Sequence, residues 1–149
     1  MKTKHENKLS VVEAADVVDH VAKTAKFRRT MVIIVVNANG ETLASAIYGV
    51  SSKHKYRTKL LVSAAEYRAN IALVTKTTTY QHLPSRRGRR RTATVHIGAG
   101  EILDHKGHLL GAIGVAGHKM NDHELAKEGR RRFCHIRQME HRHRSKGDA

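Results

Sequence analysis

Apolar residues recur at intervals of three and four in three parts of the chain, which is the spacing of helices with one buried face. The first part predicts a helix over residues 11–26, where Ser10 and Glu13 form a capping-box pattern. A second helix is predicted to begin near residue 52 with Ser51 or Ser52 as its cap, and a third near residue 121. The apolar side of the second helix is predicted to comprise Tyr56, Leu60, Leu61, Ala64, Ala65 and Tyr67.

Runs of β-branched residues between these helices predict strands. Residues 31–36 form one apolar run, and the Asn39-Gly40 pair after it suits a hairpin turn into a second strand over residues 42–48. Another strand is predicted over residues 92–97. The chain then forms a predicted hairpin whose turn lies at residues 105–108.

Residues 98–117 contain six glycines, well above the usual frequency of about 7%. Gly98 and Gly100 can adopt positive φ, which lets successive N–H groups converge on an anion or a carbonyl group. Gly114 lies inside the second strand of the hairpin, where the missing side chain lets another backbone or a ligand approach closely. Two interpretations stay open: a cradle for a ligand, or small residues that let a helix lie close on the sheet.

The glycine segment also carries a family resemblance. Gly-Ala-Ile-Gly-Val-Ala-Gly at residues 111–117, followed by Asn121-Asp122 and Ala-Lys-Glu-Gly at 126–129, resembles the closing segment of the GlcG/HbpS-like haem-binding family. The resemblance covers roughly residues 9–133. It implies an α+β, profilin- or PAS-like fold with a five-stranded antiparallel sheet and helices packed on it. It also favours a short helix within residues 70–83, although the threonines there favour a strand.

The resemblance further implies a homo-oligomer and a small-molecule ligand, which is haem or another carboxylate-bearing compound. We expect helices on one side of the sheet to leave an edge or a face exposed, and oligomerisation would cover it. The chain departs from the family pattern at Asn37, Ala99, Glu101 and Ala116, and it has Ile47-Tyr48-Gly49 where the family usually has Arg-Met-Asp before the second helix. The positions expected to form the core match the family pattern, whereas the positions expected to line the pocket differ from it. We therefore expect this chain to share the family's fold more closely than its ligand.

The candidate ligand-binding residues combine this resemblance with general chemistry. They are Lys59, Gly98, Gly100, Gly114, His96 and His118. Lys59 follows Ser52 at the family's spacing, and its ammonium would suit a haem propionate. A haem iron needs only one or two axial ligands, so a single well-placed histidine such as His96 or His118 would serve. The alternative for the lysine and for each histidine is an ordinary solvent-facing side chain.

Charge separates this chain from an average protein, because 28 Lys and Arg residues stand against 13 Asp and Glu residues. Arginines occupy five of the six positions from 86 to 91, and a second group lies between residues 130 and 144. Arginine binds phosphate with two parallel hydrogen bonds, so an alternative function is non-specific binding of a polyanion such as nucleic acid. The residues assigned to that alternative are Arg86, Arg87, Arg89, Arg90 and Arg91.

At 149 residues the chain is expected to form a single domain, with its core over residues 9–133 and a basic tail over 134–149. It contains no apolar run long enough to span a bilayer and no signal-peptide pattern at its start, so we expect a cytoplasmic protein. No P-loop, nucleophile elbow or dinucleotide fingerprint is present, which leaves enzymatic activity and any catalytic residue open. The metal content is likewise left open, since a zinc site needs four convergent ligands.

Overall fold

Three helices and six strands make up the described part of the chain in this computed structural model, which comprises residues 8–25, 31–49, 55–75, 79–84, 90–96, 98–117 and 122–147. In chain order the elements are α1 (Val11–Ala25), β1 (Met31–Asn37), β2 (Thr42–Tyr48), α2 (Lys55–Thr75), β3 (Thr79–Pro84), β4 (Arg90–His96), β5 (Ala99–Leu103), β6 (Leu109–Ala116) and α3 (Asp122–Gly147).

The main sheet is antiparallel and has the strand order β2-β1-β6-β5. It is built from two hairpins, β1–β2 and β5–β6, which meet where β1 pairs with β6. The first hairpin turns as predicted: the side-chain oxygen of Asn37 accepts hydrogen bonds from the amides of Asn39 and Glu41, and Gly40 has a φ of 84°. The two central strands, β1 and β6, are almost completely buried because helices cover both of their faces.

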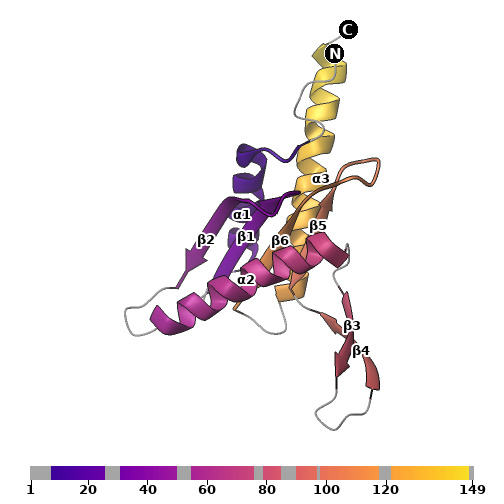
Figure 1. The fold of residues 1–149 in the computed structure, drawn as a ribbon. Helices are drawn as coiled ribbons and strands as arrows, with labels where there is room; N and C mark the ends of the chain where they lie inside the picture. Colours follow the sequence, from indigo (N-terminus) through magenta and orange to yellow (C-terminus); the bar gives the residue numbers. More distant parts are fainter. Residues whose placement is uncertain are drawn as a thin grey trace.

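Helices lie on both faces of this sheet, as Figure 1 shows. One face carries α1 and α3, and its core includes Val17, Val21, Ile33, Ile113 and Phe133. Of the described helices, α2 covers the opposite face, and its alanines pack on β1, β5 and β6. The expectation of helices on one side is therefore wrong. The outer strands β2 and β5 still end the sheet at either side.

The predicted α+β fold with an antiparallel sheet is confirmed, but the sheet has four strands and not five. The strand predicted over residues 92–97 forms as β4, yet it pairs with β3 in a separate two-stranded ribbon. The short helix expected within residues 70–83 is also wrong in part, since α2 continues to Thr75 and β3 begins at Thr79. Both differences involve β3. Residues 79–84 form this strand and not a helix, and β3 pairs with β4, which lies outside the main sheet.

The capping predicted for the start of the first helix is present in the structure, whereas that of the second helix cannot be compared. Ser10 and Glu13 form the predicted capping box, with each side chain bound to the other residue's amide at 3.1 Å. Ser51 and Ser52, the predicted caps of the second helix, lie outside the described residues. None of the helices, over the residues that the structure describes, is both long and apolar enough to cross a membrane.

Candidate functional site

The three glycines predicted to bind a ligand are neighbours in the structure. Gly98 and Gly100 flank Ala99, which pairs with Gly114 across the β5–β6 hairpin. Gly98 has a φ of 64°, as a cradle would require, and its carbonyl accepts a hydrogen bond of 2.8 Å from the amide of Val115. Gly100 does not have a positive φ, so the conformation predicted for both glycines is wrong at Gly100, which lies within strand β5. The predicted juxtaposition of these glycines is therefore present.

Groups of the protein itself lie against each of these glycines. A side chain at Gly114 would overlap the backbone carbonyl of Ala65, because α2 lies directly on β6 there. The space beside Gly100 is taken by the side chain of Arg130. At Gly114 the structure therefore matches the alternative in which a small residue lets a helix lie close on the sheet.

Beside Gly98 the space is filled by a polar cluster that the sequence did not reveal. Arg68 of α2 donates from Nη1 to the carbonyl of Val115 and to Oδ2 of Asp122, the latter at 2.8 Å. Asp122 is the first residue of α3 and is 3% exposed. The cluster ties α2, β6 and α3 together at this end of the sheet, since each of its groups comes from a different element.

The remaining predicted ligand residues are not brought to these glycines by any described contact. Lys59 is exposed on α2, six residues before Ala65, which corresponds to about 9 Å along the helix axis. His96 is the last residue of β4, and its side chain is outside the described part of the chain, as is the whole of His118. A role of these residues in ligand binding stays a prediction.

A cleft of about 480 Å³ lies at the other end of the β5–β6 hairpin. One wall is the end of β5 and its turn, and the other is the middle and second half of α3. The residues that line it are Leu103, Asp104 and His105 on the first wall, and Phe133, Cys134, Arg137, Gln138, Glu140, His141 and Arg142 on the second. Its volume lies within the range of small-molecule sites, which is about 300–1,000 Å³.

The turn that forms the first wall is held by Asp104. Its carboxylate accepts hydrogen bonds from the amides of Lys106 and His108, both at 2.8 Å, and from the His108 ring at 3.1 Å. Burial raises the pKa of Asp104, but the two amide hydrogen bonds and the His108 ring outweigh burial and leave this pKa below its usual value. The carboxylate is therefore ionised near neutral pH and belongs to the turn.

The second wall is anchored by Arg137. Its guanidinium binds Glu13 of α1, with Nε 2.6 Å from Oε2, and donates to the carbonyl of Lys8 at 2.8 Å. It also lies over the ring of Phe133, 5.0 Å from the ring centre. Because Glu13 already balances Arg137, this arginine fixes α3 against α1.

The chemistry of the cleft fits a haem group. Leu103 provides apolar surface, whereas Phe133 is almost fully buried beneath the cleft; His105 and His141 provide imidazole nitrogens, and Arg142 is a cationic residue of the lining. Among the residues that the structure describes, no three His, Cys, Asp or Glu side chains converge as ligands for a metal ion. A porphyrin supplies four nitrogens itself, so one or two protein ligands suffice.

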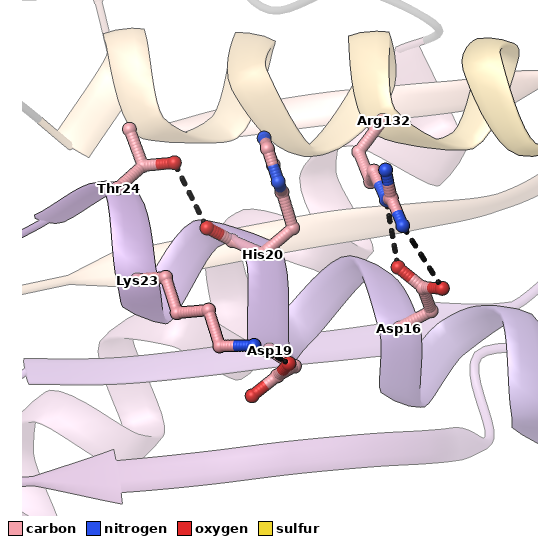
Figure 2. Close-up of polar contacts among 6 residues, drawn as sticks. All are labelled: Asp16, Asp19, His20, Lys23, Thr24 and Arg132. Atoms are coloured by element: carbon pink, nitrogen blue, oxygen red, sulfur yellow. Dashed lines mark hydrogen bonds and ion pairs between the residues drawn. The ribbon is translucent and has the colours of Figure 1, made fainter.

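Three arginines of the second group, Arg130 to Arg132 in the first half of α3, pair with acids of the same chain. Arg130 pairs with Glu101 at 3.1 Å and Arg131 with Glu128 at 3.8 Å. Figure 2 shows Arg132 reaching from α3 to Asp16 of α1, with Nε 2.7 Å and Nη2 3.3 Å from the two carboxylate oxygens. Each of these three arginines therefore balances the charge of an acidic residue of the same chain.

The first arginine group lies mostly outside the described residues. Arg86, Arg87 and Arg89 fall there, while Arg90 and Arg91 begin β4. Figure 1 shows the β3–β4 ribbon extending away from the helices and the main sheet. The two described residues of the predicted polyanion site, Arg90 and Arg91, therefore belong to this extended ribbon.

Comparisons with known proteins agree on the fold. No family model matches the sequence, and no curated protein matches it. The structure is similar to that of the Klebsiella pneumoniae protein ORFY, assigned to DUF336, with a TM-score of 0.61, 17% identity and coverage of 90% of this chain and 96% of that one.

Two further solved structures are similar. The PduOC haem complex has a TM-score of 0.61 and 15% identity, over 84% of this chain and 94% of that one. A double mutant of HbpS from Streptomyces reticuli has a TM-score of 0.54 and 19% identity, over 87% and 89%. The predicted resemblance to GlcG/HbpS-like proteins is thus confirmed in the fold that this chain adopts.

Proposed function

We propose that this protein binds haem or another carboxylate-bearing small molecule and that it acts as a homo-oligomer. The observation that carries the ligand proposal is the cleft of about 480 Å³ between the β5–β6 turn and α3, with its apolar surface, imidazoles and guanidiniums. A fold alone does not determine a function. The proposal gains support because PduOC, which has a similar fold, has been solved as a haem complex.

Two places on the molecule are candidates for the ligand. One is the cleft, and the other is the predicted region of Lys59 and the glycines of the β5–β6 hairpin. In the second region the ligand would lie over α2 near the exposed Lys59 ammonium, because α2 itself covers Gly114. Lys59 would then pair with a carboxylate of the ligand.

Titration of the protein with haemin tests the proposal. We expect the Soret band to shift and to saturate at a defined ratio of haemin to protein. Lys59→Ala weakens binding if the lysine holds a carboxylate, and Lys23→Ala, which removes an exposed lysine of α1 that does not line the cleft, is the matched control. A Soret band that neither shifts nor saturates with the wild-type protein would remove haem from consideration.

The homo-oligomer is supported by the surface of the described residues. The strands β2 and β5 end the main sheet, and open strand edges favour pairing with another chain. On α2, Leu60 is 54% exposed and Tyr67 is 65% exposed, one heptad apart on the same helix. Sedimentation at micromolar concentration should show a species at least twice the 16.7 kDa of one chain.

The apolar positions on α2 offer a variant for the same experiment. Replacement of Leu60 and Tyr67 by Ser should lower the sedimenting mass, while Val12→Ser, at an 80% exposed apolar position on α1, should leave it unchanged. A wild-type protein that sediments only as the 16.7 kDa chain would contradict the oligomer.

A second function, non-specific binding of nucleic acid, is favoured by the position of β3 and β4. A two-stranded ribbon is one of the elements that the major groove of DNA admits. The ribbon is separate from the main sheet, and β4 begins with Arg90 and Arg91. Because Arg130, Arg131 and Arg132 of α3 are paired with acids, the arginine group at residues 86–91 is the better candidate for phosphate contacts.

Gel shifts with duplex DNA at rising salt test this second function. Replacement of the five arginines at positions 86–91 by Ser should reduce the salt dependence by about 0.9 units of log–log slope for each phosphate interaction that the substitutions remove. Replacement of Lys23 and Lys106, which are exposed elsewhere, serves as the control. Absence of binding at about 50 mM salt, where phosphate interactions are strong, would rule the function out.

A further inference from the structure

We propose that the cleft between the β5–β6 turn and α3 holds an iron porphyrin through one imidazole from each wall, His105 from the turn and His141 from α3. This inference rests on the proposed function and names the residues that would bind the iron. It assigns the ligand to the cleft instead of the Lys59 region.

The wall that carries His105 is a closed hairpin turn. The amide of Gly107 donates to the carbonyl of Asp104 at 3.0 Å, and the amide of Asp104 donates to the carbonyl of His108 at 3.0 Å. The Asp104 carboxylate binds the two amides described above. These four hydrogen bonds surround residue 105, so the backbone that presents its imidazole is held without a ligand.

The wall that carries His141 is a helix fixed to the rest of the molecule one turn earlier. Arg137 is bound to Glu13 and to the Lys8 carbonyl, and Phe133 is 2% exposed in the core. His141 follows Arg137 by four residues and therefore lies on the same side of α3. The histidine is exposed on a helix whose position is already determined.

The combination of donors favours a porphyrin over a free metal ion. Two imidazoles from different elements line one cleft, but over the described ranges no third His, Cys, Asp or Glu converges with two others. A free zinc ion prefers four such ligands. A haem iron needs at most two, and the planar ring would lie against Leu103, an apolar side chain of the lining that is partly exposed.

The other polar residues of the cleft have different roles. Asp104 holds the turn and Arg137 holds α3, so neither is available to the iron. Arg142 lines the cleft beside His141, and guanidinium groups are of the kind that pair with carboxylates such as propionates. Cys134 is an exposed thiol on the same wall and is a rival axial ligand, which the experiment must distinguish from the imidazoles.

Spectra of the haemin-bound protein test the assignment. Two imidazole ligands give a six-coordinate, low-spin ferric iron, and we expect that spectrum from the wild type. His105→Ala and His141→Ala should each convert it to a high-spin form and weaken binding at least about tenfold, the lower end of the loss seen when even a hydrogen-bond partner of a metal ligand is removed. Added imidazole should restore the low-spin spectrum of either variant.

The matched control is His135→Ala, because His135 is exposed on the same helix but does not line the cleft. Its spectrum and affinity should equal those of the wild type. Circular dichroism of each variant checks that the fold is retained, which we expect because the substituted histidines are exposed.

The possible outcomes separate this inference from the proposed function. Saturable haemin binding that His105→Ala and His141→Ala leave unchanged, or that Lys59→Ala abolishes, overturns the cleft assignment while the proposed function stands. A thiolate-type spectrum that Cys134→Ser removes overturns the pair of imidazoles. A wild-type protein that does not bind haemin overturns both.

Discussion

The two faces of the central sheet are packed by opposite means. On the face covered by α1 and α3, side chains such as Val17, Ile113 and Phe133 fill the space between the layers. On the face covered by α2, alanines of the helix lie on alanines and a glycine of β5 and β6, and on Val32, Ile34 and Val36 of β1. Large side chains from both layers separate the helices from the sheet on the first face, whereas the small residues of α2 and β6 bring their backbones together on the second.

This difference determines how each face can be damaged. A face that depends on side-chain volume is weakened when atoms are removed, because a cavity remains. A face that depends on close backbone approach is weakened when atoms are added, because the backbone has to move. The face of α1 and α3 should therefore be most sensitive to substitutions that remove side-chain volume, and the face of α2 to substitutions that add it.

Removal of a large side chain from the face of α1 and α3 should give the greatest loss. Phe133 is 2% exposed and is among the largest fully buried side chains. Phe133→Ala should lower the free energy of unfolding by about 3–5 kcal/mol, as truncation of a buried aromatic residue does. Urea denaturation at neutral pH measures this change, and a loss below about 1 kcal/mol would mean that the face does not depend on side-chain volume.

Addition of a single methyl group should have different consequences at two glycines. At Gly114 the new Cβ overlaps the backbone carbonyl of Ala65, so Gly114→Ala should cost about 1–3 kcal/mol. At Gly129 in α3 the new Cβ would meet only side-chain atoms, namely Cδ1 of Ile113 at 2.6 Å and methyl groups of Val21 and Val17 at 3.2 and 3.3 Å. Gly129→Ala also gains helix propensity worth up to about 1 kcal/mol, which offsets part of the crowding, so it should lose less stability than Gly114→Ala.

The two glycine variants form a matched pair, because each adds one methyl group at a position packed against other elements. Thermal unfolding of both proteins under identical conditions gives the comparison directly. Equal losses at both sites would show that α2 is not held against the sheet by close backbone contact. A Gly114→Ala protein as stable as the wild type would lead to the same conclusion about α2.

Much of the fold could be predicted from local patterns. The Ser10–Glu13 capping box, the Asn39-Gly40 turn and the hairpin at residues 105–108 all depend on neighbours in the sequence, and the structure confirms each of them. The pairing of β3 with β4 depends on a choice between alternative partner strands. No local pattern records that choice, so local patterns could not correct the five-stranded sheet that the family resemblance implies.

The second helix shows a different limit of sequence patterns. Its apolar residues lie on more than one side, so the predicted inner face includes Leu60 and Tyr67, which are exposed. The positions that are buried are Ala65, Ala69 and Ala72. Small residues give only a weak hydropathy signal, and the glycines of β6 are the better indication of where this helix packs.

The cleft could not be predicted because its two walls are distant in the sequence. His105 and His141 each have the sequence surroundings of an ordinary surface histidine, and only the packing of α3 beside the β5–β6 turn brings them to one place. Long-range ion pairs such as Arg68–Asp122 and Arg132–Asp16 are hidden from the sequence for the same reason. The predicted ligand residues, in contrast, could be named from the sequence because they belong to local patterns. The glycines lie in one segment with His96 and His118 on either side, and Lys59 follows Ser52 at the spacing found in the family.

The smallest expected effect concerns the ion pair that joins α1 to α3. The hydrogen bond from Arg132 lowers the pKa of Asp16 below its usual value of 3.8, although burial opposes this change. A lowered pKa in the folded state means that the pair stabilises the protein above pH 3.8 and that this contribution is lost as the pH falls through the folded-state pKa. Both side chains are about one-third exposed or more, so solvent limits the contribution to at most about 1 kcal/mol.

Asp16→Asn should therefore lower the free energy of unfolding at neutral pH by up to about 1 kcal/mol, and the difference from the wild type should disappear in acid well below pH 3.8. Removal of any acid also increases repulsion in a chain of net charge +15, so the control is Asp19→Asn, which removes the same charge from the same helix. Asp19 pairs with Lys23 one turn away on α1, as Figure 2 shows, and that contact does not join two helices. Urea denaturation of the three proteins across this pH range gives the measurement. If Asp16→Asn and Asp19→Asn lose equal stability at neutral pH, the effect comes from net charge and not from the contact between α1 and α3.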